Sequence, residues 1–242
     1  MIKQNYTIAE NRLVATDTYR LVLAGDCAAE GEFVHLEIPG YYLRRPFSVC
    51  DTEDGKLVLL YKTVGEGTKA LAQMPAGAEI SVLTGLGKGF DADACQNKAL
   101  LVGGGLGAAP LYHLAKQLKA QGKNVTVVLG FNKKEEIVLE PEFRALCNTF
   151  SLATLDGTAG IKGFVTDALK ELQPEFDYFY TCGPMVMMKA VCGLLEGPGE
   201  ASLEERMGCG AGFCYGCSIQ TSGGPRRVCK DGPVFKKEEI LW

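Results

Sequence analysis

Hydrophobic and polar residues alternate in short runs over roughly the first 92 residues of the chain. The clearest apolar runs lie at residues 21–23, 33–38 and 56–61, and Gly and Pro residues separate them. Short alternating runs between turn residues are typical of strands with one buried face. The pattern therefore predicts a small antiparallel β-barrel.

The period of the pattern changes at Ala99. Apolar stretches at residues 99–102 and 125–129 enclose a glycine-rich turn and a run of apolar residues at helical spacing. That run consists of Leu111, Leu114, Ala115 and Leu118. Strand, glycine turn, helix and strand make a βαβ unit. A strand at residues 176–180 and a helix from about 184 to 195 are expected to extend it.

A break at Gly197-Pro198-Gly199 ends this second block. The segment that follows is too small to bury much core of its own, so we expect a metal to stabilise it. The predicted fold is a multidomain β plus α/β protein. Its parts are a barrel over residues 1–94, a Rossmann-like nucleotide-binding domain over 95–198 and a small metal-binding domain over 199–242.

Four cysteines of the last segment have the spacing C-x4-C-x2-C-x11-C; they are Cys209, Cys214, Cys217 and Cys229. This ligand order is that of plant-type [2Fe-2S] clusters, and the intervening glycines allow backbone N–H groups to turn toward the sulfurs. Two alternatives stay open. A zinc site usually has two C-x2-C pairs, of which only one is present, and disulfides need an oxidising compartment. A Rieske centre needs two histidine ligands, but the only histidines, His35 and His113, are far away in sequence.

Composition narrows the functional classes. The 242 residues are 47% hydrophobic and 22% charged, which is ordinary for a globular protein, and a net charge of −4 without a basic stripe argues against nucleic acid. No apolar stretch approaches the ~18 residues that span a bilayer, and the N-terminus lacks a signal-peptide core. We therefore expect a cytoplasmic protein without membrane contacts. The remaining cysteines are scattered singly, like small buried side chains of a reducing compartment: Cys27, Cys50, Cys95, Cys147, Cys182 and Cys192.

The glycine turn holds Gly103, Gly104, Gly105 and Gly107. Glycines at a strand end let a pyrophosphate approach backbone N–H groups and the positive end of the next helix. A plain tight turn is the alternative, but the predicted flanking strand and helix favour a nucleotide. The acidic residue that would bind a ribose hydroxyl is not cleanly placed, so the choice between NAD and NADP stays open.

The first block contains two further candidate segments. Residues 44–48 offer a cation for phosphate in Arg45, an aromatic ring in Phe47 and a hydroxyl in Ser48. Thr68 precedes an apolar run and is expected near a helix N-terminus, a second anion site. Taken singly, these segments are explained better by an edge-strand Pro with solvated arginines and by a simple helix cap at Thr68.

The order of these segments resembles the ferredoxin-NADP reductase superfamily. That order is Arg45-Pro46-Phe47-Ser48, Leu60-Tyr61-Lys62, Gly67-Thr68, the turn from Gly103 to Pro110, and Cys182-Gly183-Pro184-Met185. The cysteine tail, with Arg227-Val228-Cys229-Lys230-Asp231-Gly232-Pro233, closely resembles the electron-transfer subunits of class 1B dihydroorotate dehydrogenases. The resemblance covers essentially the whole chain.

This resemblance implies three cofactors, FAD, a [2Fe-2S] cluster and NAD(H), and no catalytic acid or base on this chain. FAD would contact Arg45, Pro46, Phe47, Ser48, Leu60, Tyr61, Lys62, Gly67 and Thr68. The pyridine nucleotide would contact Gly103, Gly105, Gly107, Cys182, Gly183 and Pro184. Many members of the wider superfamily have Tyr where Phe47 stands, so one hydrogen bond to the flavin is absent here.

The resemblance also implies a partner and a direction of electron flow. Electrons would enter at the cluster from an FMN-containing dihydroorotate dehydrogenase catalytic subunit, in an expected heterotetramer of two copies of each chain, and leave on NAD+. Three alternatives remain: the flavoprotein subunit of an NADH-ferredoxin:NADP transhydrogenase or sulfide dehydrogenase-like enzyme, a stand-alone flavin or ferredoxin reductase, and a zinc-stapled nucleotide-binding module.

Overall fold

The computed structural model describes residues 1–25 and 33–242. The chain forms two compact units, residues 1–89 with 204–233 and residues 90–203 with 234–242. The segment after residue 203 is thus shared between both units, and the three-domain division stays a prediction. Cys27, expected as a small buried residue, lies outside the described residues.

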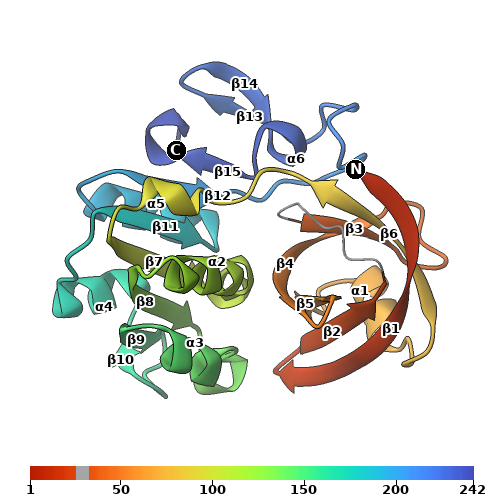
Figure 1. The fold of residues 1–242 in the computed structure, drawn as a ribbon, viewed down its shortest axis with the longest axis horizontal. Helices are drawn as coiled ribbons and strands as arrows, with labels where there is room; N and C mark the ends of the chain where they lie inside the picture. The colour runs from red at the N-terminus through yellow and green to blue at the C-terminus, as the bar shows by residue number, and fades with distance from the viewer. Residues whose placement is uncertain (26–32) are drawn as a thin grey trace. The chain divides into compact units, whose positions relative to one another are not determined.

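The first unit contains a closed six-stranded barrel in the order β1-β2-β5-β4-β3-β6, with every neighbouring pair antiparallel (Figure 1). Its strands are β1 (Ile2–Ala15), β2 (Thr18–Ala24), β3 (Phe33–Glu37), β4 (Arg45–Glu53), β5 (Lys56–Lys62) and β6 (Glu79–Leu86), with helix α1 (Glu66–Ala72) between β5 and β6. The predicted antiparallel barrel is confirmed.

Strand alternation explains the core of the barrel. On β3, Val34 and Leu36 belong to the buried core cluster together with residues of all the other strands. Phe33 and His35 point to the opposite face of the strand, because successive side chains alternate. His35 is nevertheless fully buried, so this outer face of β3 is covered.

The segment of residues 204–233 packs with the barrel in the same unit. It contains the two-stranded ribbon β13 (Ser218–Thr221) and β14 (Gly224–Arg227), followed by helix α6 (Val228–Asp231). The backbone N–H of Lys88 donates to the carbonyl oxygen of Gly232 at 2.7 Å. This bond joins the end of the segment to the chain just after β6.

The second unit is built on a seven-stranded sheet in the order β10-β9-β8-β7-β11-β12-β15, parallel except for β15 at the edge. The strands are β7 (Lys98–Gly104), β8 (Asn124–Phe131), β9 (Thr149–Thr154), β10 (Ile161–Lys162), β11 (Tyr178–Cys182), β12 (Gly199–Ser202) and β15 (Val234–Lys236). The order of strands reverses between β7 and β11. The expected Rossmann-like architecture is confirmed.

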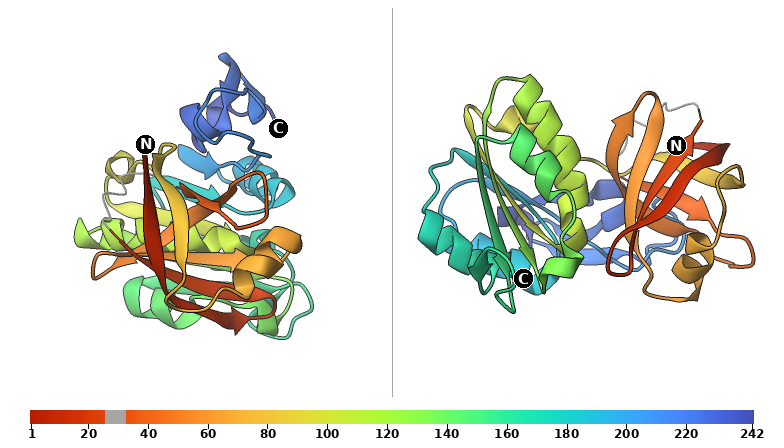
Figure 2. Two further views of the ribbon diagram at one scale, coloured as in Figure 1. Left: turned by 90° about the vertical axis from the view of Figure 1, so that its right-hand side faces the viewer. Right: turned by 90° about the horizontal axis from the view of Figure 1, so that it is seen from below.

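Helices cover both faces of this sheet, with α2 and α3 on one face and α4 and α5 on the other (Figure 2). They are α2 (Ala108–Ala120), α3 (Glu140–Leu146), α4 (Val165–Leu172) and α5 (Met185–Leu194). Short 3-10 turns are η1 (Ala92–Ala94), η2 (Gly105–Gly107), η3 (Lys134–Glu136) and η4 (Lys237–Glu239). Among the described residues, none of the helices is long and apolar enough to cross a bilayer.

One strand boundary differs from the expectation. The strand expected at residues 176–180 is β11, which begins at Tyr178 and ends at Cys182. The carboxylate of Asp177 accepts the backbone N–H groups of Gln96, Asn97 and Lys98 at 2.7–3.0 Å. Asp177 therefore binds the backbone that leads into β7, and it precedes β11 rather than forming part of it.

Candidate cofactor-binding sites

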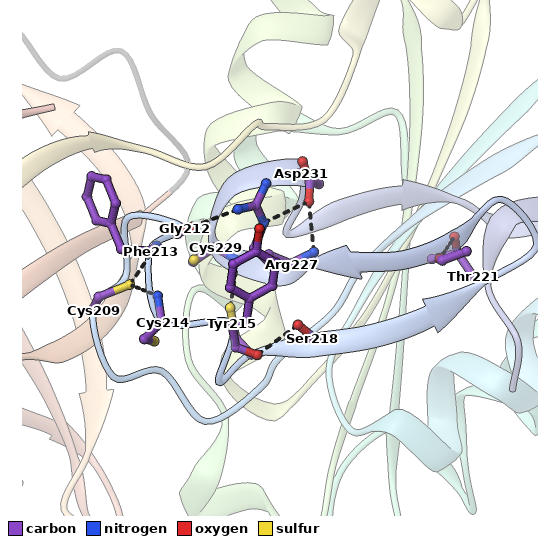
Figure 3. A network of polar contacts seen from close by, with 12 residues as sticks. Cys209, Gly212, Phe213, Cys214, Tyr215, Ser218, Thr221, Arg227, Cys229 and Asp231 are labelled. Atoms are coloured by element: carbon purple, nitrogen blue, oxygen red, sulfur yellow. Dashed lines mark hydrogen bonds and ion pairs between the residues drawn. The ribbon is translucent and has the colours of Figure 1, made fainter.

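Cys209 lies in a loop that wraps around its own sulfur (Figure 3). Its Sγ accepts backbone N–H groups from Ala211 at 3.5 Å, Phe213 at 3.2 Å and Cys214 at 3.4 Å. Burial acts to raise the pKa of Cys209, but these donors outweigh it and lower the pKa to about 6. The residue is therefore set up as a thiolate, the form that binds iron.

The other cysteines of the motif complete two neighbouring pairs. Cys209 interacts with Cys214 through their side chains, as Cys217 does with Cys229. The backbone N–H of Cys229 also points at Cys217 Sγ, 3.4 Å away. Burial, and then the hydrogen bond to Cys217, raise the pKa of Cys229 to about 12. Two pairs of thiols fit a two-iron cluster, because each of its two irons takes two of the four protein thiolates.

No group of three or more His, Cys, Asp or Glu residues surrounds a single ion position within the described ranges. The fit to a cluster therefore rests on the two pairs and on the N–H groups aimed at sulfur. The ligand role of all four cysteines stays a prediction.

Two glycines of residues 209–217, the cluster loop, have no room for a side chain. Gly210 has φ +65° and Gly212 has φ +82°, a region that residues with a Cβ rarely adopt. A Cβ at Gly212 would lie 2.6 Å from the side chain of Lys230, and one at Gly210 would lie 2.2 Å from the ring of His35. The glycine-rich composition of the motif thus reflects close packing on both sides of the loop.

A polar network stabilises the same loop (Figure 3). It was not predicted from the sequence. The guanidinium of Arg227 donates to the carbonyl oxygen of Gly212 at 2.7 Å and lies 4.7 Å from the ring centre of Tyr215. The carboxylate of Asp231 accepts the backbone N–H of Arg227 at 2.8 Å and pairs with its guanidinium. The available signal was the i,i+4 spacing of these opposite charges, which here join the end of β14 to the end of α6.

The residues expected at FAD lie on neighbouring elements of the first unit. Arg45 to Ser48 begin β4, Leu60 to Lys62 end β5, and Val49 of β4 is paired with Leu59 of β5. A Cβ on Gly67, in the first turn of α1, would lie 3.3 Å from Nε of Arg45. The guanidinium of Arg45 is thus adjacent to Gly67. The structure brings these candidates together, and their contact with FAD stays a prediction.

Several side chains of this group already have protein partners. Phe47 and Tyr61 form an edge-to-face pair in the barrel core with ring centres 5.6 Å apart. The hydroxyl of Tyr61 donates to Asn11 Oδ1 at 2.9 Å. The Thr68 hydroxyl accepts the backbone N–H groups of Val64 and Gly65, so its local role is to close the start of α1.

The residues expected at the pyridine nucleotide meet at one edge of the second unit. The glycine turn begins in the last residues of β7, and Cys182-Gly183-Pro184 begins at the last residue of β11. In these paired parallel strands Cys182 stands opposite Gly103. A Cβ on Gly107 would lie 2.1 Å from the carbonyl oxygen of Cys182. A Cβ on Gly183, which has φ +146°, would lie 2.9 Å from the backbone nitrogen of Gly104. Positions 107 and 183 must therefore be glycine for the ends of β7 and β11 to come this close.

This edge is where the strand order reverses between β7 and β11. In open α/β sheets, ligands bind beyond the carboxyl ends of the strands at such a reversal. Helix α2 begins directly after the glycine turn, so its N-terminus faces the same edge.

Met187, a further residue at this edge, was not predicted from the sequence. A Cβ on Gly104 would lie 2.4 Å from its sulfur.

Five of the remaining cysteines are described, and none of these five is part of a disulfide. Cys50, Cys95 and Cys182 are buried, as expected, whereas Cys147 and Cys192 are only partly buried.

Comparison with known proteins identifies two families along the chain. Residues 204–241 match the iron-sulfur cluster binding domain of dihydroorotate dehydrogenase B, and residues 101–193 match the oxidoreductase NAD-binding domain. The cysteine loop and the sheet edge described above lie in these two ranges.

Curated relatives match over nearly the full length. The electron transfer subunit of dihydroorotate dehydrogenase B (NAD(+)) from Fusobacterium nucleatum is 41% identical, over 98% of this chain and 98% of that protein. Its counterpart from Geobacillus thermodenitrificans is 42% identical, over 99% of this chain and 98% of that protein.

Solved structures share the fold. That of an NADH-dependent reduced ferredoxin-NADP oxidoreductase is similar with a TM-score of 0.89 and 33% identity, over 98% of this chain and 90% of that chain. Phthalate dioxygenase reductase matches with a TM-score of 0.65 and 19% identity, over 79% of this chain and 64% of that chain. The latter supports the fold alone.

Proposed function

Since this chain belongs to the family of electron transfer subunits of dihydroorotate dehydrogenase B, we propose that it carries electrons from a dihydroorotate-oxidising catalytic subunit to NAD+. It is an oxidoreductase subunit of pyrimidine synthesis that uses FAD, a [2Fe-2S] cluster and NAD(H). The observation that carries this proposal is the pairing of Cys209 with Cys214 and of Cys217 with Cys229, together with the backbone N–H groups that point at Cys209 Sγ.

The three cofactors divide the chemistry. Nicotinamide exchanges a hydride, the cluster exchanges one electron at a time and the flavin can do both, so the flavin stands between the other two. The protein's task is to bind and orient them. In our proposal Arg45 and Gly67 face the FAD diphosphate, the turns at Gly103–Gly107 and Cys182–Pro184 hold the pyridine nucleotide, and Cys209, Cys214, Cys217 and Cys229 hold the cluster.

The partner is proposed to be an FMN-containing catalytic subunit, in an assembly with two copies of each chain. The cluster loop supplies the supporting observation, because Phe213 and Tyr215, on either side of the exposed Cys214, are 75% and 66% exposed. Aromatic side chains exposed to this degree are typical of residues that a partner covers. Electron entry at the cluster requires the same surface.

The test compares the isolated chain with the complex. We expect about two iron atoms and two acid-labile sulfides per chain, and FAD released on denaturation. The isolated chain should pass electrons from NADH to artificial acceptors without converting dihydroorotate. Adding the FMN-bearing subunit should give NAD+-dependent turnover.

Three outcomes would contradict the proposal. Stoichiometric zinc without labile sulfide would identify the zinc-stapled module. Oxidation of dihydroorotate by the isolated chain, or failure to form a complex in size-exclusion chromatography, would favour the transhydrogenase-like alternative. That alternative has support in the structure that is 33% identical to this chain, less than the 41% and 42% of the two curated relatives.

Reversal of the charge at Arg45 is expected to weaken FAD retention at least tenfold. The substitution Arg45→Glu places a carboxylate beside Gly67, where the proposed diphosphate would lie, and like charges repel strongly in a partly desolvated site. The measurement is flavin content per chain after gel filtration. Lys3→Glu, a charge reversal at an exposed position of β1, is the matched control and should retain flavin. Equal flavin content in both variants would rule out this role of Arg45.

A further inference from the structure

His35 lies between the proposed flavin strand and the cluster loop. It is part of β3 and is paired with Pro46 of β4, within the segment Arg45–Ser48. A Cβ built on Gly210 would lie 2.2 Å from Cε1, 2.5 Å from Nε2 and 2.6 Å from Nδ1 of His35. These three distances place Gly210 over the face of the imidazole at Cε1, so the ring packs flat against the residue next to Cys209.

Neither ring nitrogen has a hydrogen-bond partner among the residues that the structure describes, although the side chain is fully buried. Buried polar groups are almost always hydrogen-bonded, because an unmet donor or acceptor loses its interaction with water. Burial and the nearby Arg44 lower the pKa of His35 to about 4, so the ring is neutral at physiological pH. A neutral imidazole has one N–H group, which requires a hydrogen-bond acceptor.

None of the described residues accepts a hydrogen bond from the ring. Phe33 presents an apolar ring with its centre 5.6 Å away. The guanidinium of Arg44 is itself a donor, and it bonds the carbonyl oxygens of His35 and Ser81 and the carboxylate of Glu37. On the side of Gly210 the ring packs against the cluster loop, which would surround the sulfurs of the cluster.

We propose that His35 is a positioning residue for the iron-sulfur centre, with its ring N–H donating a hydrogen bond to a sulfur of that centre. This inference rests on the proposed function. Hydrogen bonds to sulfur stabilise the more negative, reduced state of a cluster and raise its reduction potential. His35 would thus set the potential of the cluster from the strand that neighbours the flavin segment.

The direct test uses the fact that the chain has only two histidines, His35 and His113. The full chain, carrying FAD and the cluster, is produced with 15N-labelled histidine and reduced, and its cluster signal is measured by pulsed electron paramagnetic resonance. We expect a weak 15N coupling in the unsubstituted chain and in His113→Gln, in which His35 is the only labelled residue. Absence of the coupling in His113→Gln would overturn the inference.

A second measurement follows the reduction potential of the cluster. In His35→Phe, which keeps a ring but removes both nitrogens, the ratio of reduced to oxidised cluster at a fixed ambient potential should fall about tenfold, equivalent to about 59 mV for one electron. Val34→Ala is the control, because Val34 is just as buried but faces the barrel core. An equal potential in His35→Phe and the unsubstituted chain would overturn the inference.

These outcomes separate the inference from the proposed function. A chain without iron and labile sulfide would refute the cluster and with it the proposed function. A chain with an intact cluster but no 15N coupling would refute the role of His35 alone. If His35→Phe does not retain the cluster, the presence or absence of the 15N coupling in labelled His113→Gln still tests the role of His35.

Discussion

Cys217→Ala is expected to abolish NAD+-dependent dihydroorotate oxidation by the complex, by more than about 100-fold. Cys217 is buried and lies beside Cys229, so its loss leaves one of the two proposed irons with a single thiolate. Even the partners of metal ligands contribute 10- to 100-fold to affinity, and a ligand itself contributes more. The iron content of the purified chain and the turnover of the complex measure the effect.

The reaction of the same variant with artificial acceptors should survive, because reduction of the flavin by NADH does not pass through the cluster. Cys147→Ala is the matched control, since it removes a partly buried cysteine of the second unit that lies outside the motif. It should keep both the iron and the turnover. A Cys217→Ala chain that retains about two irons and two sulfides would show that this residue is not a ligand.

Gly107→Ala is expected to raise the KM for NADH by at least about tenfold. The added Cβ would lie 2.1 Å from the carbonyl oxygen of Cys182, a backbone atom that cannot rotate away. The glycine turn and the end of β11 must then separate, and displacements of about 1 Å at a binding site can reduce rates by up to 100-fold. Steady-state kinetics with an artificial acceptor measure the effect, while FAD and iron contents should not change.

Gly193→Ala is the control for this prediction. Gly193 lies in α5 of the same unit, and a Cβ there meets no atom within 4 Å. Alanine also favours a helix over glycine by about 0.5–1 kcal/mol, so this variant should be at least as stable as the unsubstituted chain. If both variants bound NADH equally well, the contact between the two turns would have no role in nucleotide binding.

The elements predicted correctly are those whose pattern is local. Alternation along β3 and β5 revealed the barrel, and the change of period at Ala99 revealed β7, α2 and β8. The pattern of hydrophobic and polar residues did not reveal β9, β10, α3 and α4, which lie within residues 140–172. The strand β9 (TFSLAT) is half polar and partly exposed, so its apolar period is weak.

Candidate site residues show the same division between local and distant information. The spacing of the four cysteines is visible in the sequence, and the structure places them in two adjoining pairs. The approach of Gly107 to Cys182 and that of His35 to Gly210 join residues far apart in the chain. No local pattern encodes such contacts, because they depend on how strands are ordered in a sheet or barrel.

The antiparallel pairing of β15 with β12 has a consequence for the cluster-binding segment. Ser202 stands opposite Val234 at the point where the chain leaves the sheet and returns to it. Residues 203–233 therefore form a closed loop rather than a free tail, and a closed loop gains less conformational entropy when it unfolds. Loss of metal should leave both ends of this loop in place. We expect a chain stripped of iron to take it up again without refolding from the denatured state.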